Sequence, residues 1–266
     1  NERPFDDPST IVLAYGHSPS HISDPQADGE IQVAVGSGDG SGAYSFSTFM
    51  AVPDHTPDFG EALVNFPQLA RINDMPAMIY NQTPNGGWQR DCYYTFASNV
   101  EGSAGWGSGV ALPQLNGINN GANRTLFDIG GHAAFATNYN HVNSTFELVY
   151  LVSDAIGPAL GSLTEVVLPD TAGGAIHKAF SMSSGEPAIL SSWWGWGARY
   201  QESSSTLGEQ PSDWGFPRGR MTGSYSDYPY GPVGIELGDG SVCIAYVDNP
   251  NGPNVWYSLY FKLGDL

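Results

Sequence analysis

The sequence has few basic residues and no long apolar run. Its 266 residues include 9 Lys and Arg against 27 Asp and Glu, which gives a formal net charge of −18. Nucleic acid and anionic membranes are both disfavoured as partners, because binding them requires clustered basic side chains. No stretch is long and apolar enough to insert into a bilayer. The acidity favours a salt-exposed surface and an extracellular or cell-surface location.

Helical periodicity is also missing: no segment longer than a turn or two carries it. The chain instead has 34 Gly and 19 Pro. Glycine reaches positive φ and proline presets turn geometry, so this composition suits many short strands joined by tight turns. The sequence therefore predicts an all-β domain.

A short apolar strand followed by an aromatic-rich strand recurs along the chain. The first strands contain Ile31, Ala77, Ala133, Ala188 and Val242, which are 46, 56, 55 and 54 residues apart. An all-strand repeat of about this length is typical of a β-propeller blade. We therefore expect a single β-propeller of five blades, each of three to four antiparallel strands, over residues 27–266. The repeats are expected at about 27–67, 68–115, 124–170, 175–222 and 226–266.

Residues 1–26 do not fit this repeat and are predicted to form an N-terminal extension with one strand at 10–15. The strand is apolar on both faces, so it must be buried. The fifth repeat stops without an outer strand. We expect the N-terminal strand to pair there and close the ring, or to pair in the same way with a neighbouring copy of the chain.

The chain has two cysteines, Cys92 and Cys243. Both lie within strand patterns, in repeats that do not adjoin in a five-membered ring. A disulfide needs Cα atoms within about 7 Å, so two buried thiols are favoured over a bridge.

Two carboxylates fall on predicted innermost strands, Asp128 in Leu126–Ile129 and Glu236 in Gly234–Leu237. Paired carboxylates are the requirement of glycoside hydrolysis. If the chain is an enzyme, Asp128 and Glu236 are its candidate catalytic residues. With 27 acids present, however, two such positions are expected by chance, and the interpretation leans away from an enzyme. The six histidines form no metal-binding pattern, and no metal or cofactor is predicted.

Aromatic residues are concentrated in Ser192–Gly197 and Tyr225–Tyr230. Exposed indole and phenol rings provide a platform for a sugar ring. The candidate ligand-binding residues are Trp193, Trp194, Trp196, Tyr228 and Tyr230. The alternative is packing between blades.

Three Asn-Xaa-Thr triplets begin at Asn81, Asn123 and Asn143. All three fall in predicted loops or at strand ends, where a glycan could be attached. They are candidate glycosylation sites.

Several segments resemble secreted propellers of the sialidase-like type. Ile72–Tyr80 and Gly185–Leu190 are similar to the inner strands of those proteins. Ser98–Gly102 with Trp106, and Ser205–Gly208 with Trp214, resemble the turn between outer strands known as the Asp box, without its Asp. The resemblance implies a propeller and carries over no catalytic residue.

Three functions are compatible with these features. The leading hypothesis is a non-catalytic extracellular structural propeller that self-assembles through its N-terminal strand as a glycan-decorated fibre or surface-layer subunit. The second is a lectin-like propeller that binds carbohydrate. The third is a secreted glycoside hydrolase or lyase.

Overall fold

The computed structural model describes thirteen segments of the chain. They are residues 10–17, 30–38, 43–52, 64–82, 91–107, 109–113, 124–140, 146–169, 174–193, 197–215, 230–237, 242–248 and 258–262. Within them the regular structure is almost entirely β, and a 3₁₀ turn spans Pro211–Asp213. No helix in these segments could cross a membrane.

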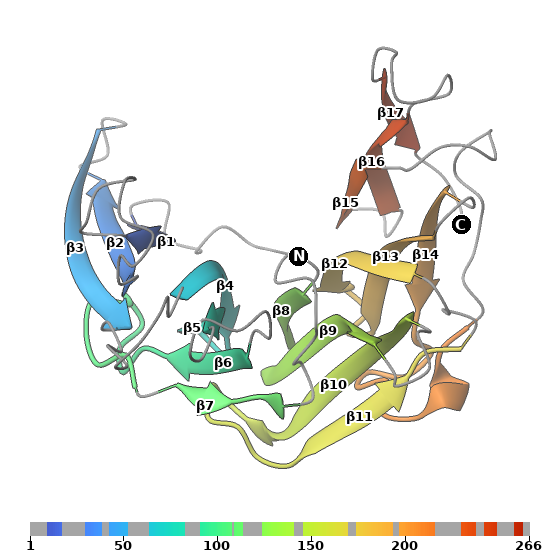
Figure 1. Ribbon diagram of the computed structural model, residues 1–266, viewed down its shortest axis with the longest axis horizontal. Coiled ribbons are helices and arrows are strands. Elements are labelled where there is room, and N and C mark those ends of the chain that lie inside the picture. The colour runs from blue at the N-terminus through green and yellow to red at the C-terminus, as the bar shows by residue number, and fades with distance from the viewer. Residues whose placement is uncertain are drawn as a thin grey trace. The chain divides into compact units, whose positions relative to one another are not determined.

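The strands form five separate antiparallel sheets in chain order (Figure 1). The first sheet contains β1 (Thr10–His17), β2 (Glu30–Gly38) and β3 (Tyr44–Val52). The second contains β4 (Val64–Ile72), β5 (Met75–Gln82), β6 (Asp91–Phe96) and β7 (Val110–Ala111). The third contains β8 (Arg124–Ile129), β9 (His132–Asn140), β10 (Phe146–Ile156) and β11 (Leu163–Val167). The fourth contains β12 (Gly174–Ser181), β13 (Pro187–Trp193) and β14 (Gly197–Glu202), and the fifth β15 (Tyr230–Glu236), β16 (Val242–Asp248) and β17 (Ser258–Lys262).

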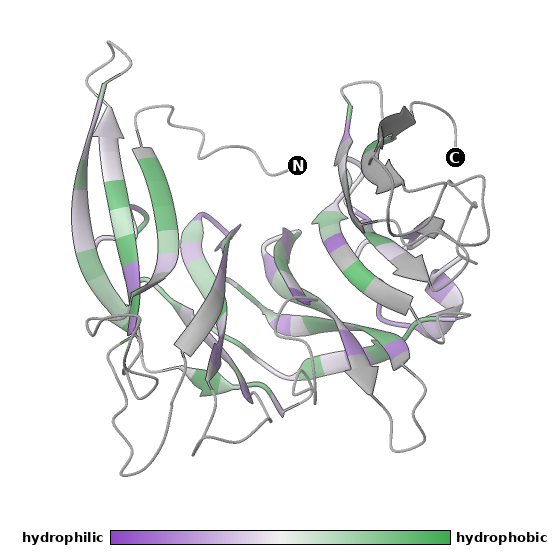
Figure 2. Cartoon of the chain, turned by 45° about the horizontal axis from the view of Figure 1, so that its top comes forward, coloured by the Kyte–Doolittle hydropathy of each residue, from purple (hydrophilic) through white to green (hydrophobic). Residues whose placement is uncertain are grey.

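The predicted all-β fold, built from antiparallel sheets, is confirmed. Hydrophobic stretches, in green, are interspersed with more polar ones along the described strands (Figure 2). The number of blades in a closed ring stays a prediction.

The sheets belong to two compact units. Residues 2–122 with 156–159 form the N-terminal unit, which contains the first two sheets. Residues 123–155 with 160–266 form the C-terminal unit, which contains the other three. Within each unit the first strands of successive sheets lie against each other: β1 against β4, and β12 against both β8 and β15.

The predicted pairing of the N-terminal strand is wrong. β1 pairs with β2 along its whole length, from Thr10 opposite Ser37 to His17 opposite Glu30. The strand is therefore the first member of its own sheet, and it does not complete the fifth repeat. The expected burial of both faces holds for one face only: Val12 is buried, whereas Leu13 and Tyr15 on the other face are 50% and 39% exposed. The same pairing removes the reason for placing β1 in a neighbouring copy.

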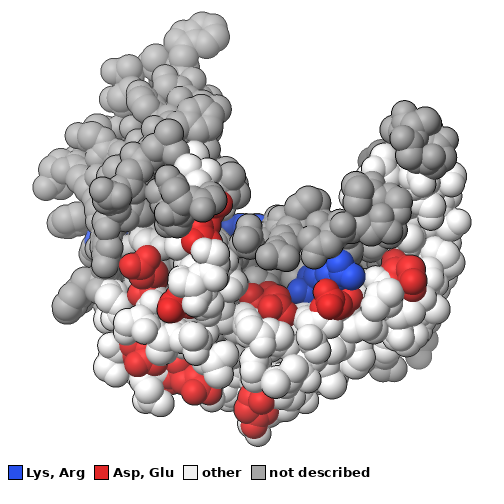
Figure 3. Space-filling view, turned by 180° about the vertical axis from the view of Figure 1, so that it is seen from behind, with Lys and Arg blue, Asp and Glu red and all other residues white. Residues whose placement is uncertain are grey.

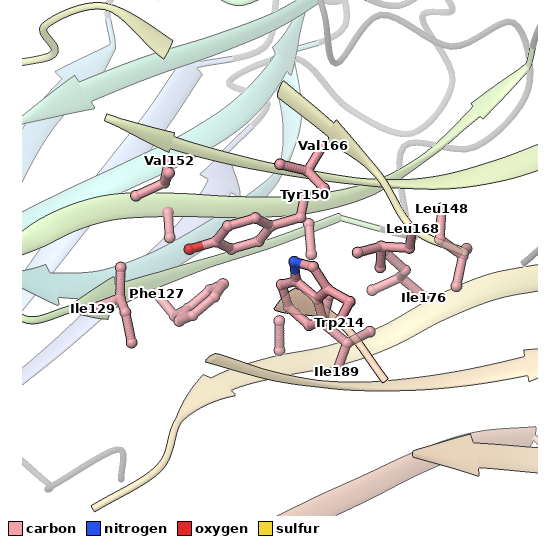
Figure 4. Packing of buried hydrophobic residues seen from close by; sticks show 13 residues of the cluster. Phe127, Ile129, Leu148, Tyr150, Val152, Val166, Leu168, Ile176, Ile189 and Trp214 are labelled. Carbon is pink, nitrogen blue, oxygen red and sulfur yellow. The ribbon is translucent and has the colours of Figure 1, made fainter. Parts of the chain in front are cut away.

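The core of the C-terminal unit is centred on two aromatic side chains, Tyr150 and Trp214 (Figure 4). Their ring centroids are 5.0 Å apart at 59°. The Tyr150 hydroxyl donates a hydrogen bond to the Leu207 carbonyl at 2.9 Å, and burial raises the pKa of Tyr150. This core joins the third sheet to the turn that follows β14.

The two Gly–Trp turns singled out in the sequence share one hydrogen bond. The Trp106 indole donates to the Gly102 carbonyl, and the Trp214 indole donates to the Gly208 carbonyl, each at 2.9 Å. Both glycines have positive φ, +73° and +60°, which the missing side chain permits. The turns are thus equivalent structural closures in the second and fourth sheets.

The two cysteines are placed differently in their sheets. Cys92 is buried in β6 and Cys243 is half-buried in β16. The prediction that both thiols are buried is therefore correct for Cys92 and only partly so for Cys243. Acidic side chains are spread over the face shown in Figure 3, as the net charge leads one to expect.

Candidate functional site

Each sheet of the C-terminal unit has two distinct ends. At the leading end the first strand begins, at Arg124, Gly174 or Tyr230; at the hairpin end it turns into the second strand. Two hydrogen bonds show that the leading ends of adjacent sheets lie side by side, and that their hairpin ends do so too. The Ile176 amide near the start of β12 donates to Asn138 near the end of β9, and the Ser183 amide after β12 donates to Glu236 at the end of β15. The predicted site residues can therefore be assigned to one end or the other.

Asp128 lies at the hairpin end of β8 and holds the turn that follows. Its Oδ1 accepts a hydrogen bond from the Gly131 amide at 3.1 Å. Gly130 and Gly131 have φ values of +60° and +87°, as a tight two-residue hairpin requires. Asp128 is half-buried, and this contact assigns it a structural task.

Glu236 also lies at the hairpin end, at the last position of β15. One carboxylate oxygen accepts from the Ser183 amide and the other from the Ser183 hydroxyl at 2.6 Å. Both oxygens are engaged by the turn between β12 and β13. Glu236 therefore links the fifth sheet to the fourth.

The leading end is irregular in its backbone. The β12–β13 register shifts between Ile176 and Lys178, which makes His177 the extra residue of a β-bulge. The β15–β16 register shifts between Tyr230 and Val233. The Asn138 Oδ1 accepts from the Ile176 amide at 2.6 Å and so anchors the first of these bulges. Bulges re-aim side chains and are enriched next to active sites.

The same irregularity recurs in the N-terminal unit. In β4 the register with β5 shifts between Asn65 and Gln68, again near the start of the first strand. The shifts in β4 and β15 each span a proline, Pro67 and Pro232. Proline within a strand is confined to edges and bulges. A proline near the start of a predicted strand was therefore the feature of the sequence from which the bulges in β4 and β15 could have been predicted.

Buried polar groups gather at the leading end of the third sheet. Arg124 and Thr137 are opposite each other in β8 and β9, and their exposed fractions are 4% and 2%. Glu147, at the start of β10, is half-buried. Burial of a charged side chain is costly unless the surroundings compensate it. Sequence reasoning missed both Arg124 and Glu147, because single charged residues at strand starts carry no distinctive spacing.

The aromatic candidates lie at the opposite end from the carboxylates. Trp193 ends β13, opposite Gly197, and Tyr230 begins β15. Tyr230 and Glu236 are at the two ends of one strand, which separates them by about 20 Å at 3.3 Å per residue. They cannot hold the same sugar ring. Trp194, Trp196 and Tyr228 lie outside the described residues.

The glycosylation candidates have different environments. Asn81 lies in β5 and is 2% exposed, so the structure contradicts it as a glycan site: a glycan would have to displace the core around it. Asn123 and Asn143 lie outside the described residues. Within the segments that the structure describes, no three His, Cys, Asp or Glu residues gather as a metal site would require.

Comparison with known proteins gives similarities of fold. No known family description matches the chain, and no curated protein does. Among solved structures, an alpha-L-arabinofuranosidase from Lactobacillus brevis is 12% identical, with 95% of this chain and 86% of that chain covered and a TM-score of 0.47. A thermostable family-43 glycoside hydrolase is 13% identical, with 95% and 90% covered and a TM-score of 0.46. An endo-arabinanase from Bacillus licheniformis is 13% identical, with 97% and 90% covered and a TM-score of 0.41.

These similarities correct the leading hypothesis drawn from the sequence. The solved structures that the chain resembles are glycoside hydrolases, a finding that contradicts the leading non-catalytic structural hypothesis. The hydrolase alternative is taken up below as a proposal. The finer resemblance to sialidase-like turns finds no support in these comparisons. At these identities and TM-scores no residue role or substrate is transferred, and the roles below rest on the chain's own residues.

Proposed function

We propose that the chain is a glycoside hydrolase whose carbohydrate site lies at the leading end of the C-terminal unit. The observation that carries the proposal is the division of tasks between the two ends. At the hairpin end, Asp128 and Glu236 are engaged in turns. At the leading end, β12 and β15 each carry a bulge, and the β12 bulge is anchored by Asn138, the residue after Thr137, which lies opposite the buried Arg124.

The leading end supplies three elements that a sugar site needs. Trp193 ends β13 and Tyr230 begins β15, so the sequence places an aromatic residue at this end of both strands, the residue type on which a sugar ring can stack. Arg124 provides hydrogen-bond donors in a fixed fork. Glu147 provides a half-buried carboxyl group for proton transfer to the leaving oxygen.

Glycoside hydrolysis requires a second carboxyl group, as nucleophile or as base. Asp248 ends β16 beside Val247, which pairs with Tyr230, so its backbone lies at the leading end. We assign Asp248 as the position to test for this second role. Secretion belongs to the same proposal, because polysaccharides are degraded outside the cell and the acidic surface suits that location.

The test is hydrolysis of a panel of polysaccharides, including arabinan, arabinoxylan and xylan, followed by chromatography of the released sugars. Glu147→Gln is expected to lower kcat by more than about 10²-fold, the effect of losing acid–base catalysis. Asp128→Asn and Glu236→Gln are the matched controls and should retain activity within about threefold. Each replaces a carboxylate by its amide in the same unit, at the other end of the strands.

Two results would overturn the proposal. One is the absence of cleavage of every polysaccharide in the panel; binding without cleavage would then favour the lectin-like alternative. The other is loss of activity in Asp128→Asn or Glu236→Gln while Glu147→Gln stays active. The anomeric form of the first product, followed by NMR, also reports the spacing of the two carboxyl groups, about 5 Å for retention and about 6.5–9.5 Å for inversion.

In a host that glycosylates secreted proteins, we also propose that Asn123 and Asn143 carry glycans. Intact mass before and after glycosidase treatment measures it. Asn81 is expected to stay unmodified because its side chain is buried.

A further inference from the structure

The last strand of the first sheet, β3, is exposed along most of its length. The strand order is β1-β2-β3, and no further strand of the described segments pairs with β3. Its apolar side chains Tyr44, Phe46 and Met50 are 38%, 50% and 57% exposed. An edge strand of this kind presents a row of backbone donors and acceptors that can pair with another strand.

The exposed aromatic residues are seated on their own sheet. The ring centroids of Tyr44 and Phe46 are 6.4 Å apart. Phe46 lies directly over Gly36 in β2, where an added Cβ would come within 2.6 Å of its ring. The edge is therefore ordered in advance, which lowers the entropy lost when a second strand pairs with it.

β3 differs from the other last strands in charge. The strand Tyr44–Val52 has nine residues and no charged side chain. By contrast, β11 contains Glu165, β14 ends at Glu202 and β17 ends at Lys262, while β7 is two residues long. Natural edge strands are commonly protected by charges or by short length. Only β3, among the last strands that the structure describes, has neither protection.

We propose that β3 pairs antiparallel with β3 of a second copy of this chain, across a two-fold axis. The argument for a second copy is electrostatic. The chain carries −18, so two copies repel each other wherever acidic surfaces meet. Because β3 itself carries no carboxylate, two copies that pair through it oppose no acidic side chains within the strand, and a strand without charge is complementary to itself. Because the contact uses the same patch on both copies, it closes as a dimer and does not propagate.

The expected dimer is weak. A nine-residue strand spans about 30 Å, and pairing of two such edges buries less than the roughly 1,200 Å² of standard interfaces. Dissociation constants in the micromolar range are therefore expected. Added salt should strengthen the dimer, since the screening length falls from about 10 Å at 0.1 M to about 3 Å at 1 M.

The experiment is sedimentation velocity of the full chain from about 5 to 500 μM, at 0.1 M and 1 M NaCl. The wild-type mass is expected to rise from 28.4 kDa toward twice that value, more steeply at high salt. Met50→Lys and, independently, Thr48→Lys should weaken the dimer at least tenfold, since each dimer contains the substitution twice. Val110→Lys is the matched control: Val110 is 52% exposed on β7, in the same unit, and the charge change is identical. It should leave dimerisation unchanged within about twofold.

Three results would overturn the proposal. The first is a wild-type chain that stays monomeric at every concentration and salt, as it would if another part of the chain or a different partner covers β3. The second is equal weakening by Met50→Lys and Val110→Lys, which places the contact elsewhere. The third is a mass that increases beyond the dimer without limit. None of these depends on enzymatic activity, so this test is independent of the proposed function.

Discussion

The two Gly–Trp turns allow one interaction to be measured in two environments. Trp214→Phe and Trp106→Phe each remove an indole N–H that donates to a glycine carbonyl at 2.9 Å. Trp214 is 4% exposed and packs against Tyr150, whereas Trp106 is half-buried. Both variants lose the same hydrogen bond. Any difference between their losses in unfolding free energy therefore reflects the difference in burial of the two indoles.

The expected magnitudes follow from that comparison. An unsatisfied buried carbonyl costs about 1–3 kcal/mol, and the shortened ring at position 214 leaves a cavity. Trp214→Phe should therefore destabilise the C-terminal unit by about 2–4 kcal/mol. Trp106→Phe should cost the N-terminal unit about 1 kcal/mol, because water can reach part of the vacated space.

The assay combines guanidinium unfolding followed by far-UV circular dichroism with amide hydrogen exchange. Hydrogen exchange around residues 203–215 and 98–107 separates the two units, which need not unfold together. Equal costs for the two variants would refute the reasoning. So would a cost for Trp214→Phe below about 0.5 kcal/mol.

Three further predictions concern turns and a buried phenol. Gly208→Ala should cost more than Gly130→Ala in thermal unfolding: both glycines have φ of +60°, but an added Cβ at 208 meets Trp214 at 3.0 Å and one at 130 meets nothing within 4 Å; equal costs would contradict this. In a double-mutant cycle, Glu236→Gln and Ser183→Ala should be coupled by about 0.5–1 kcal/mol, and additive effects would argue against the Glu236 link. Burial raises the pKa of Tyr80 to about 12 from 10.0, so its stabilising contribution is complete below pH 10 and is lost as pH rises through 12. Tyr80→Phe should therefore show a smaller fall in Tm between pH 10 and 12, and an unchanged fall would count against that shift.

The sequence by itself determined the class of fold and most of the strands. Strand length, turn residues and aromatic spacing are local properties. The five apolar strands predicted around Ile31, Ala77, Ala133, Ala188 and Val242 are therefore found as β2, β5, β9, β13 and β16. The equivalence of the two Gly–Trp turns was also visible in the sequence, because each turn closes within a few residues.

Only the tertiary structure decided which strands pair and what the candidate carboxylates do. The existence of β1 could be read from its residues, but its partner and the exposure of its Leu13 face could not, since apolar strands fit many edges and the choice depends on chain connectivity. Asp128 and Glu236, predicted on innermost strands, lie on the first strands of their sheets, where one Asp128 oxygen accepts from Gly131 and both Glu236 oxygens accept from Ser183. Glu236 and Ser183 are 53 residues apart in the chain. Contacts at that separation depend on how neighbouring sheets pack, which no local pattern in the sequence specifies.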